Sequence, residues 1–245
     1  MIQLQSIALA PFTAVEPLNP RFQTGHPKLR LTVDAEPMPD VPDQALYARL
    51  VSAFPQLARH HCHVQDGGSP RDPRARGVVL VDGETTANQA HLLEHLLLDM
   101  LSFLDRAPRL SGVTCAYTSP PERSDVFVEC VDGESGSLAA RVAVDAVNAA
   151  LAGEPLSPLY PDVLKCARLV RRHAGHPWPA ARLARAARIP RARAEAALEA
   201  LAHAAFVELE SYALNFSSEP HYRFVGAGVT GRARVRPPGP FPSRR

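Results

Sequence analysis

Hydrophobic and polar positions largely alternate along two short segments near the start of the chain, residues 2–7 and 29–33. Alternation is typical of a β-strand with one buried face, because successive side chains point to opposite sides of a sheet. The pattern predicts strands in both segments. Further strands are predicted over residues 77–81, 113–117 and 126–131.

Apolar residues at helical spacing predict three helices in the same half of the chain, over residues 44–57, 90–104 and 134–151. Leucines fill much of the second helix from Leu92 to Leu104, so we expect it to be largely buried. Strands interleaved with helices predict an α+β domain, with a mixed sheet covered by helices. We assign this domain to residues 1–153.

The remaining residues are predicted to form three helices and then two strands, at 159–174, 180–188, 191–204, 206–209 and 221–225. Three helices with a tight turn, followed by a hairpin, are the order of a winged helix-turn-helix. We therefore predict a small winged-helix domain at residues 158–228. The Pro- and Arg-rich segment at residues 229–245 is predicted to be a disordered basic tail.

Net charge separates the two predicted halves of the chain. Residues 1–153 carry 12 Lys and Arg against 18 Asp and Glu, a net charge of −6, whereas residues 154–245 carry 15 against 7, a net charge of +8. An acidic half suits cation binding and a basic half suits a polyanion, although either excess also arises on solvated surfaces.

Cysteine usage and the N-terminal segment bear on the compartment. Four widely separated cysteines include no Cys-x-x-Cys pair, which argues against a disulfide framework and a structural zinc ribbon. The N-terminal segment lacks the basic region and cleavage site of a signal peptide, and no stretch approaches the roughly 18 consecutive apolar residues of a membrane span. We predict a cytoplasmic protein with no membrane partner, and the sequence leaves open whether it forms a homo-oligomer.

The apolar helix predicted at residues 90–104 contains the segment His91-Leu92-Leu93-Glu94-His95. Side chains at i and i+4 share a helical face, so His91 and His95 can present two imidazole nitrogens to one metal ion. The order His-x-x-Glu-His is the inverted zincin motif, in which the carboxylate takes a proton from a metal-activated water. We predict a zinc-dependent hydrolase with Glu94 as its general base.

A structural polar cluster, or the exposed stripe of an amphipathic helix, is the alternative interpretation of the same five residues. Burial separates the two interpretations, because an ionised glutamate flanked by two histidines is costly inside a leucine-rich helix unless it is paired or close to a metal. The leucine content of this helix favours the metal site.

Several further motifs accompany the histidine motif between residues 44 and 151. In chain order they are Phe54-Pro55-Gln56-Leu57, His60-x-Cys62, Gly67-Gly68, the histidine motif with Leu98-Asp99, Val126-Phe127-Val128-Glu129, Glu134-x-Gly136 and Ala139-Ala140-Arg141-Val142-Ala143-Val144. In their order and spacing they resemble the N-terminal domain of cyanophycin synthetases, bacterial enzymes that polymerise aspartate and arginine.

The resemblance implies a metal-dependent peptidase that cuts a peptide polymer internally, with zinc as its cofactor. By matching position, it implies His91 and His95 as zinc ligands and Glu94 as general base. Glu134 is the first choice for the third ligand and Glu129 the second, and Asp99 is expected to orient one imidazole. Each of these three acids can instead be a solvated charge, and Glu134 can simply favour a helix N-terminus. No Walker-type phosphate loop occurs, so ATP use is not expected.

A second group of ligand-type residues, His60-His61-Cys62-His63, offers a rival metal site. Adjacent residues in a loop cannot easily all reach one ion. We therefore favour a pocket wall, in which His60 contacts substrate and Cys62 is a small buried hydrophobe.

The basic half predicts contacts with DNA. Arg191 and Arg193 open the predicted recognition helix, where side chains can meet base edges, while Arg182, Arg185 and Arg188 could meet phosphates. The arginines of the tail could strengthen nonspecific contact. Winged helices also serve as protein-docking modules, and an alanine-rich helix that carries two glutamates is not an ideal groove reader. The alternative function is a DNA-binding regulator whose metallopeptidase-like half senses a ligand.

Overall fold

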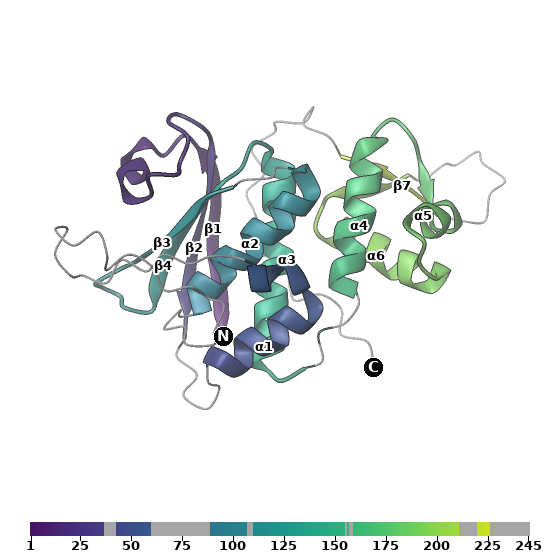
Figure 1. Cartoon of the computed structure of the whole chain (residues 1–245). Coiled ribbons are helices and arrows are strands. Elements are labelled where there is room, and N and C mark those ends of the chain that lie inside the picture. Colours follow the sequence, from purple (N-terminus) through teal and green to yellow (C-terminus); the bar gives the residue numbers. More distant parts are fainter. Residues whose placement is uncertain are drawn as a thin grey trace.

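The computed structural model describes residues 1–36, 43–59, 89–106, 110–154, 156, 159–210 and 220–225. Its larger sheet contains β1 (Ile2–Ala10), β2 (Lys28–Ala35), β3 (Gly112–Ala116) and β4 (Arg123–Glu129), in the order β1-β2-β4-β3 (Figure 1). Every neighbouring pair is antiparallel. The predicted α+β class is confirmed, and the sheet is antiparallel where a mixed sheet was expected.

The antiparallel sheet follows from the position of β4. Strands β2 and β3 run in the same direction, but β4 lies between them and pairs with both. The chain that joins β2 to β3 therefore passes over one strand position, as in a split β-α-β unit. For this reason, interleaved strands and helices do not produce parallel neighbours here.

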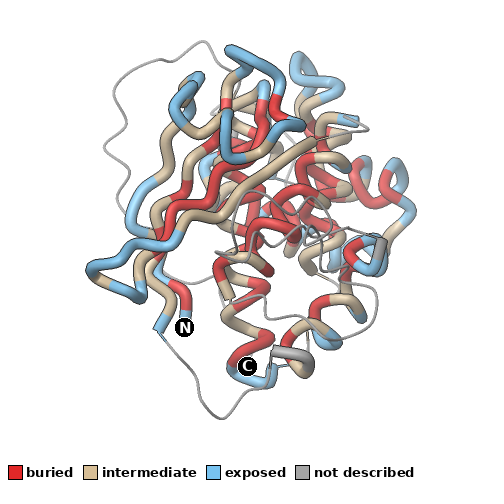
Figure 2. Tube along the Cα trace, turned by 60° about the vertical axis from the view of Figure 1, so that its left-hand side comes forward, coloured by how far each residue is buried: buried red, intermediate tan, exposed pale blue. Residues whose placement is uncertain are grey.

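Three helices lie on one face of this sheet: α1 (Asp43–Ala53), α2 (Gln89–Asp105) and α3 (Gly133–Leu151) (Figure 1). Short 3-10 helices, η1 (Thr13–Leu18) and η2 (Pro55–Arg59), follow β1 and α1. The alternation predicted for β2 is observed, because Leu29, Leu31 and Val33 are at most 1% exposed, and Figure 2 shows buried residues along the strands and the helices. The strand predicted at residues 77–81 lies outside the described residues. No helix in the described ranges is long and apolar enough to cross a bilayer.

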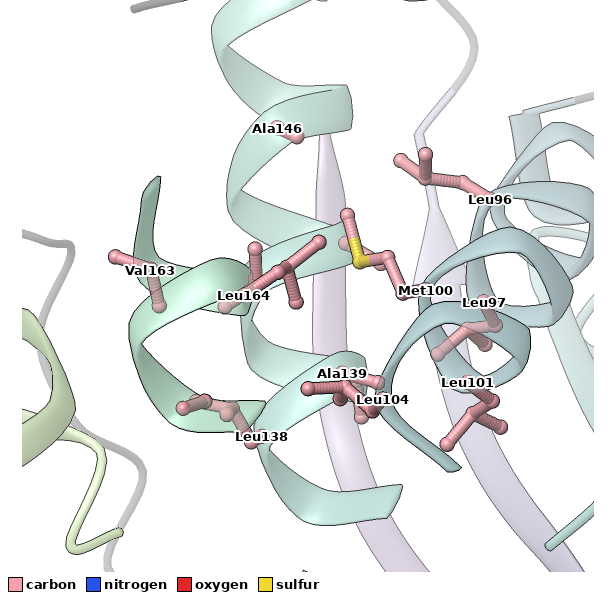
Figure 3. Close-up of a cluster of buried hydrophobic side chains, with 14 of the residues drawn as sticks. Leu96, Leu97, Met100, Leu101, Leu104, Leu138, Ala139, Ala146, Val163 and Leu164 are labelled. Carbon is pink, nitrogen blue, oxygen red and sulfur yellow. The ribbon is translucent and has the colours of Figure 1, made fainter. Parts of the chain in front are cut away.

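Helix α2 is buried around most of its circumference. Leucines of α2 pack against the sheet on one side and against α3 and α4 (Leu159–Arg172) on the other. Figure 3 shows side chains of the three helices meeting in one cluster, which includes Leu97, Met100, Leu138 and Leu164. Glu94 and His95 of α2 are therefore buried within a largely apolar helix.

The C-terminal elements follow the predicted order. After α4 come β5 (Trp178–Pro179), α5 (Ala180–Ala187), α6 (Arg191–His203), β6 (Val207–Glu210) and β7 (His221–Phe224). The three strands form a small antiparallel sheet in the order β5-β7-β6. This is the sequence of elements on which the winged-helix prediction rests. The tail predicted at residues 229–245 lies outside the described residues.

One hydrophobic core runs through both predicted domains. Buried side chains of α2, α3 and α4 form a single cluster with those of α5 and α6. Polar contacts of Arg171 also join α2, α3 and α4. Arg171 of α4 bonds Asp105 at the end of α2, and it donates to Ser135 near the start of α3 at 2.5 Å. The predicted boundary between residues 153 and 158 therefore separates two sets of elements but not two cores.

Lys28, at the start of β2, is fully buried. Its ammonium group donates to Glu16 Oε1 at 2.8 Å and to the carbonyl oxygens of His26 and Pro11 at 3.0 and 3.1 Å. It also lies 5.2 Å from the centroid of the Phe22 ring. These contacts fasten the segment between β1 and β2, including η1, to the end of the sheet.

Candidate functional site

His91 and His95 occupy successive turns near the N-terminus of α2, and their imidazole Nε2 atoms approach each other to 3.1 Å. The two rings are nearly parallel, with 5.0 Å between centroids and 20° between planes. His95 is buried and His91 is half-buried. Burial lowers the pKa of His91, which favours the neutral imidazole that metals bind.

The separation of the two Nε2 atoms fits two ligands of one zinc ion. With Zn–N bonds of about 2.0–2.1 Å and tetrahedral angles, two ligand nitrogens would lie about 3.3–3.4 Å apart. The observed 3.1 Å also fits one N–H···N hydrogen bond between two neutral imidazoles. Metal binding is therefore the measurement that separates the two explanations.

Glu94 directly precedes His95, and its side chain meets the edge strand β3. The Thr114 hydroxyl donates to Glu94 Oε2 at 2.6 Å, and only 6% of the glutamate is exposed. Burial raises the pKa of Glu94 to about 7, and the bond from Thr114 offsets part of the rise. A carboxylate with this pKa can take up and return a proton near neutral pH.

Gly112 provides the space for this carboxylate. A Cβ atom at residue 112 would lie 2.8 Å from Glu94 Oε1 and 3.0 Å from the carbonyl oxygen of Phe127. The Phe127 oxygen belongs to the paired backbone of β4 and cannot yield easily. Any larger residue at position 112 would therefore have to displace Glu94.

For the zinc hydrolase predicted from the sequence, we expect Gly112→Ala to lower the hydrolysis rate without lowering the metal content. The added methyl group would move Glu94 away from Thr114, and overpacking of this kind destabilises a fold by about 1–3 kcal/mol. Hydrolysis rate, metal content and the free energy of unfolding should be measured together. Gly175→Ala is the matched control, because a Cβ atom there meets nothing within 4 Å. Full activity of Gly112→Ala would show that the position of Glu94 does not matter.

Glu134 does not lie beside the histidines. It follows Asp132, the N-cap residue of α3, and it interacts electrostatically with Asp132 and Arg171. Arg171 also bonds Asp105, the last residue of α2. Asp105 comes fourteen residues after His91, which corresponds to about 21 Å along a helix. The first choice for a third ligand is thus at the opposite end of α2.

Glu129 is buried at the end of β4, where its carboxylate is bonded to backbone. Oε1 accepts from Gln23 N at 2.7 Å and Oε2 accepts from Ser111 N at 3.0 Å. Both oxygens are therefore occupied by backbone amides of neighbouring segments. Within the described ranges, no three His, Cys, Asp or Glu side chains are grouped to hold a metal ion. The described residues thus bring two candidate ligands together and no third.

The other sequence-predicted residues of this site remain predictions. Asp99 is half-buried and lies one turn beyond His95 on the same face of α2, which is where a carboxylate that orients the imidazole is expected. His60 and Cys62 lie outside the described residues, and so does the rest of their cluster.

The two arginines predicted to read bases from α6 are both paired with acids. Arg193 Nε donates to Oδ2 of Asp162 at 2.5 Å, and Asp162 is a buried residue of α4. Arg191 Nε donates to Glu195 Oε1 at 2.9 Å, one turn along the same helix. Arg193 therefore joins α6 to α4 in this structure, and it is not extended toward a partner.

The three arginines predicted to meet phosphates lie on and just after α5. Arg182, Arg185 and Arg188 are all exposed. Arg182 lies over the ring of the buried Trp178, with 4.8 Å between guanidinium carbon and centroid. Arg188 ends the helix in a left-handed conformation, with a φ of 54°.

Sequence reasoning did not identify Gly112 and Thr114 as site residues. Residue 114 falls in a predicted strand, and alternation gives the face of a strand but not the side chain that packs against it. The contact with Glu94 spans eighteen to twenty residues and depends on how α2 crosses β3. No local pattern in the sequence carries that information.

Comparison of the chain with protein-family models and with curated protein sequences found no match. A functional assignment therefore depends on the geometry of α2 and on the chemistry of its side chains.

Proposed function

We propose that the protein is a zinc-dependent hydrolase that cleaves peptide or amide bonds. The observation that carries the proposal is the 3.1 Å approach of the His91 and His95 Nε2 atoms, next in sequence to the buried Glu94. Polar side chains lose hydration when buried in a leucine-rich helix, so such a group is unfavourable unless its members are paired or bind an ion.

The roles of the side chains follow from their chemistry. His91 and His95 would hold the metal through Nε2, and zinc supplies a Lewis acid that makes water a nucleophile near neutral pH. Glu94 takes a proton from the attacking water and returns it to the leaving amine nitrogen. Thr114 fixes the orientation of the Glu94 carboxylate through its hydroxyl, and Gly112 leaves room for it.

The substrate class in this proposal is a peptide, cyanophycin-like or otherwise, because the motifs between residues 44 and 151 resemble the peptidase-like domain of cyanophycin synthetases.

We propose that the protein acts in the cytoplasm. In the described part of the chain Cys115, Cys130 and Cys166 are free thiols, which supports a reducing compartment.

We expect the purified protein to bind one equivalent of zinc, and His91→Ala and His95→Ala each to weaken that binding by at least about 100-fold. Loss of an outer partner of a metal ligand already weakens binding by 10–100-fold, and loss of a ligand does more. Elemental analysis and calorimetric titration with zinc chloride measure the effect. His26→Ala is the control, because it removes an exposed imidazole far along the chain from α2.

Absence of zinc binding in a folded protein would contradict the hydrolase. The contact between the histidines would then be a hydrogen bond within a structural polar cluster. That result would favour the second function predicted from sequence, a regulator whose metallopeptidase-like half senses a ligand.

A further inference from the structure

A long segment that covers much of the described C-terminal helices contains no acidic residue. Residues 163–194 include nine Lys and Arg and no Asp or Glu. The segment runs through most of α4, through β5 and α5, and into α6. A charge excess this continuous is either neutralised by acids from elsewhere in the fold or exposed to a partner.

Part of the excess is used inside the protein. Arg171 bonds Asp105 and lies 3.3 Å from Asp132, and Arg193 bonds Asp162. The guanidinium of Arg168 lies 4.3 Å from the centroid of the Phe103 ring. These three arginines join the C-terminal helices to their neighbours and to α2.

Apart from Arg168, four arginines of residues 163–194 make no ion pair with a described residue: Arg172, Arg182, Arg185 and Arg188. All four are exposed; Arg172 ends α4 and the other three lie on or just after α5, and we call this group the α5 basic face. Arg182 and Arg185 are three residues apart on one helix, where Cβ atoms lie about 5–6 Å apart. Trp178 connects this helix with the end of α4, because its ring contacts Arg182 and also lies 5.9 Å from the ring of His173, the residue after Arg172.

The exposed side of α6 is less suited to an anion. Arg191 is paired with Glu195, and Glu195 and Glu199 are both exposed one turn apart. Both glutamates also influence Tyr222 of β7 electrostatically, so the negative charge extends toward the small sheet. Like charges that face a phosphate oppose its approach.

We propose that the α5 basic face binds the phosphate backbone of double-stranded DNA without reading its sequence. Guanidinium groups match phosphate oxygens in pairs, and exposed arginines three residues apart on one helix can contact neighbouring phosphates. An anionic membrane is the less suitable partner. Among the described residues, no large exposed hydrophobic side chain lies within residues 163–194 to enter a lipid surface. This proposal goes beyond the hydrolase and does not depend on the metal.

The test is fluorescence anisotropy of the full chain with a labelled DNA duplex at several salt concentrations. Four phosphate contacts give a slope of log K against log salt of about −3.6. We expect the double variant Arg182→Gln with Arg185→Gln to reduce that slope in magnitude by about 2. A second duplex of unrelated sequence should bind equally well.

The decisive comparison is between Arg185→Gln and Arg191→Gln, because each variant removes one exposed positive charge from the C-terminal helices. The proposal expects weaker binding only for Arg185→Gln. If Arg191→Gln lowered the DNA affinity as much as Arg185→Gln or more, α6 would be the DNA-binding helix and the proposal would be overturned. Tighter binding to anionic lipid vesicles than to DNA would also overturn it. Thermal melting of each variant checks the fold. His95→Ala should bind DNA as strongly as the wild type, because the DNA-binding proposal does not depend on zinc. This result separates a failure of the DNA proposal from a failure of the hydrolase proposal.

Discussion

Replacing Glu94 with glutamine is expected to lower the hydrolysis rate by about 10²–10⁴-fold while zinc stays bound, which is the range for loss of a general base. Glutamine keeps the size of the side chain and an oxygen that can accept from Thr114, but it cannot take a proton from water. The measurement is the turnover of zinc-loaded protein on peptides that contain aspartate and arginine, followed by mass spectrometry of the products. Zinc content is measured on the same samples.

Glu122→Gln is the matched control for this variant, because Glu122 is exposed and the charge change is the same. It should retain both zinc and turnover. If Glu94→Gln turned over substrate at the wild-type rate, Glu94 would not be the base. If it lost zinc instead, Glu94 would be a ligand or would hold one in place.

Lys28→Met is expected to destabilise the fold by about 1–3 kcal/mol, the range for leaving buried hydrogen-bonding groups without their partner. The methionine fills similar space, but it removes the cation beside Glu16 and leaves two backbone carbonyl oxygens without the lysine donor. Urea denaturation followed by circular dichroism measures the free energy of unfolding. Lys165→Met is the control, because Lys165 is the only other lysine of the chain and is half-buried on α4; it should change stability by less than about 0.5 kcal/mol.

The pH dependence of the same variant supplies a second readout. The hydrogen bond from Lys28 lowers the pKa of Glu16 below 4.5. The stabilisation from this pair is therefore complete above pH 4.5, and it is lost as the pH falls through the lowered pKa. The difference between wild type and Lys28→Met should shrink in that acidic range. A difference that stayed constant down to pH 2 would mean that Glu16 is not the important partner.

Local patterns were sufficient to predict most elements of the fold. The strands at β1, β2, β3 and β4 and the helices α2 and α3 were predicted within a few residues of their observed ends, because the strands are alternating or short apolar segments and the helices have a period of 3.6. The antiparallel arrangement was not predicted, since it depends on β4 inserting between β2 and β3. Strand order is a property of the whole chain and leaves no mark on any single segment.

The candidate site, too, could be predicted only in part from the sequence. His91, Glu94 and His95 belong to one helix, so their spacing alone places two imidazoles together. Glu134 was preferred as a third ligand because it opens the next helix, yet α3 begins beside the far end of α2. Likewise, the exposed α6 arginines could be counted from the sequence, but the acid that holds Arg193 is thirty-one residues earlier, on α4.

The way α4 closes over α2 has a consequence for any dissection of the chain. Leucines that complete the centre of the first half touch helix α4, which a conventional cut near residue 154 would discard. A fragment that ends there would expose apolar surface to water and would tend to aggregate. The two halves should therefore be expressed as one polypeptide. A substitution at the contact between α2 and α4 is expected to affect the stability of both halves.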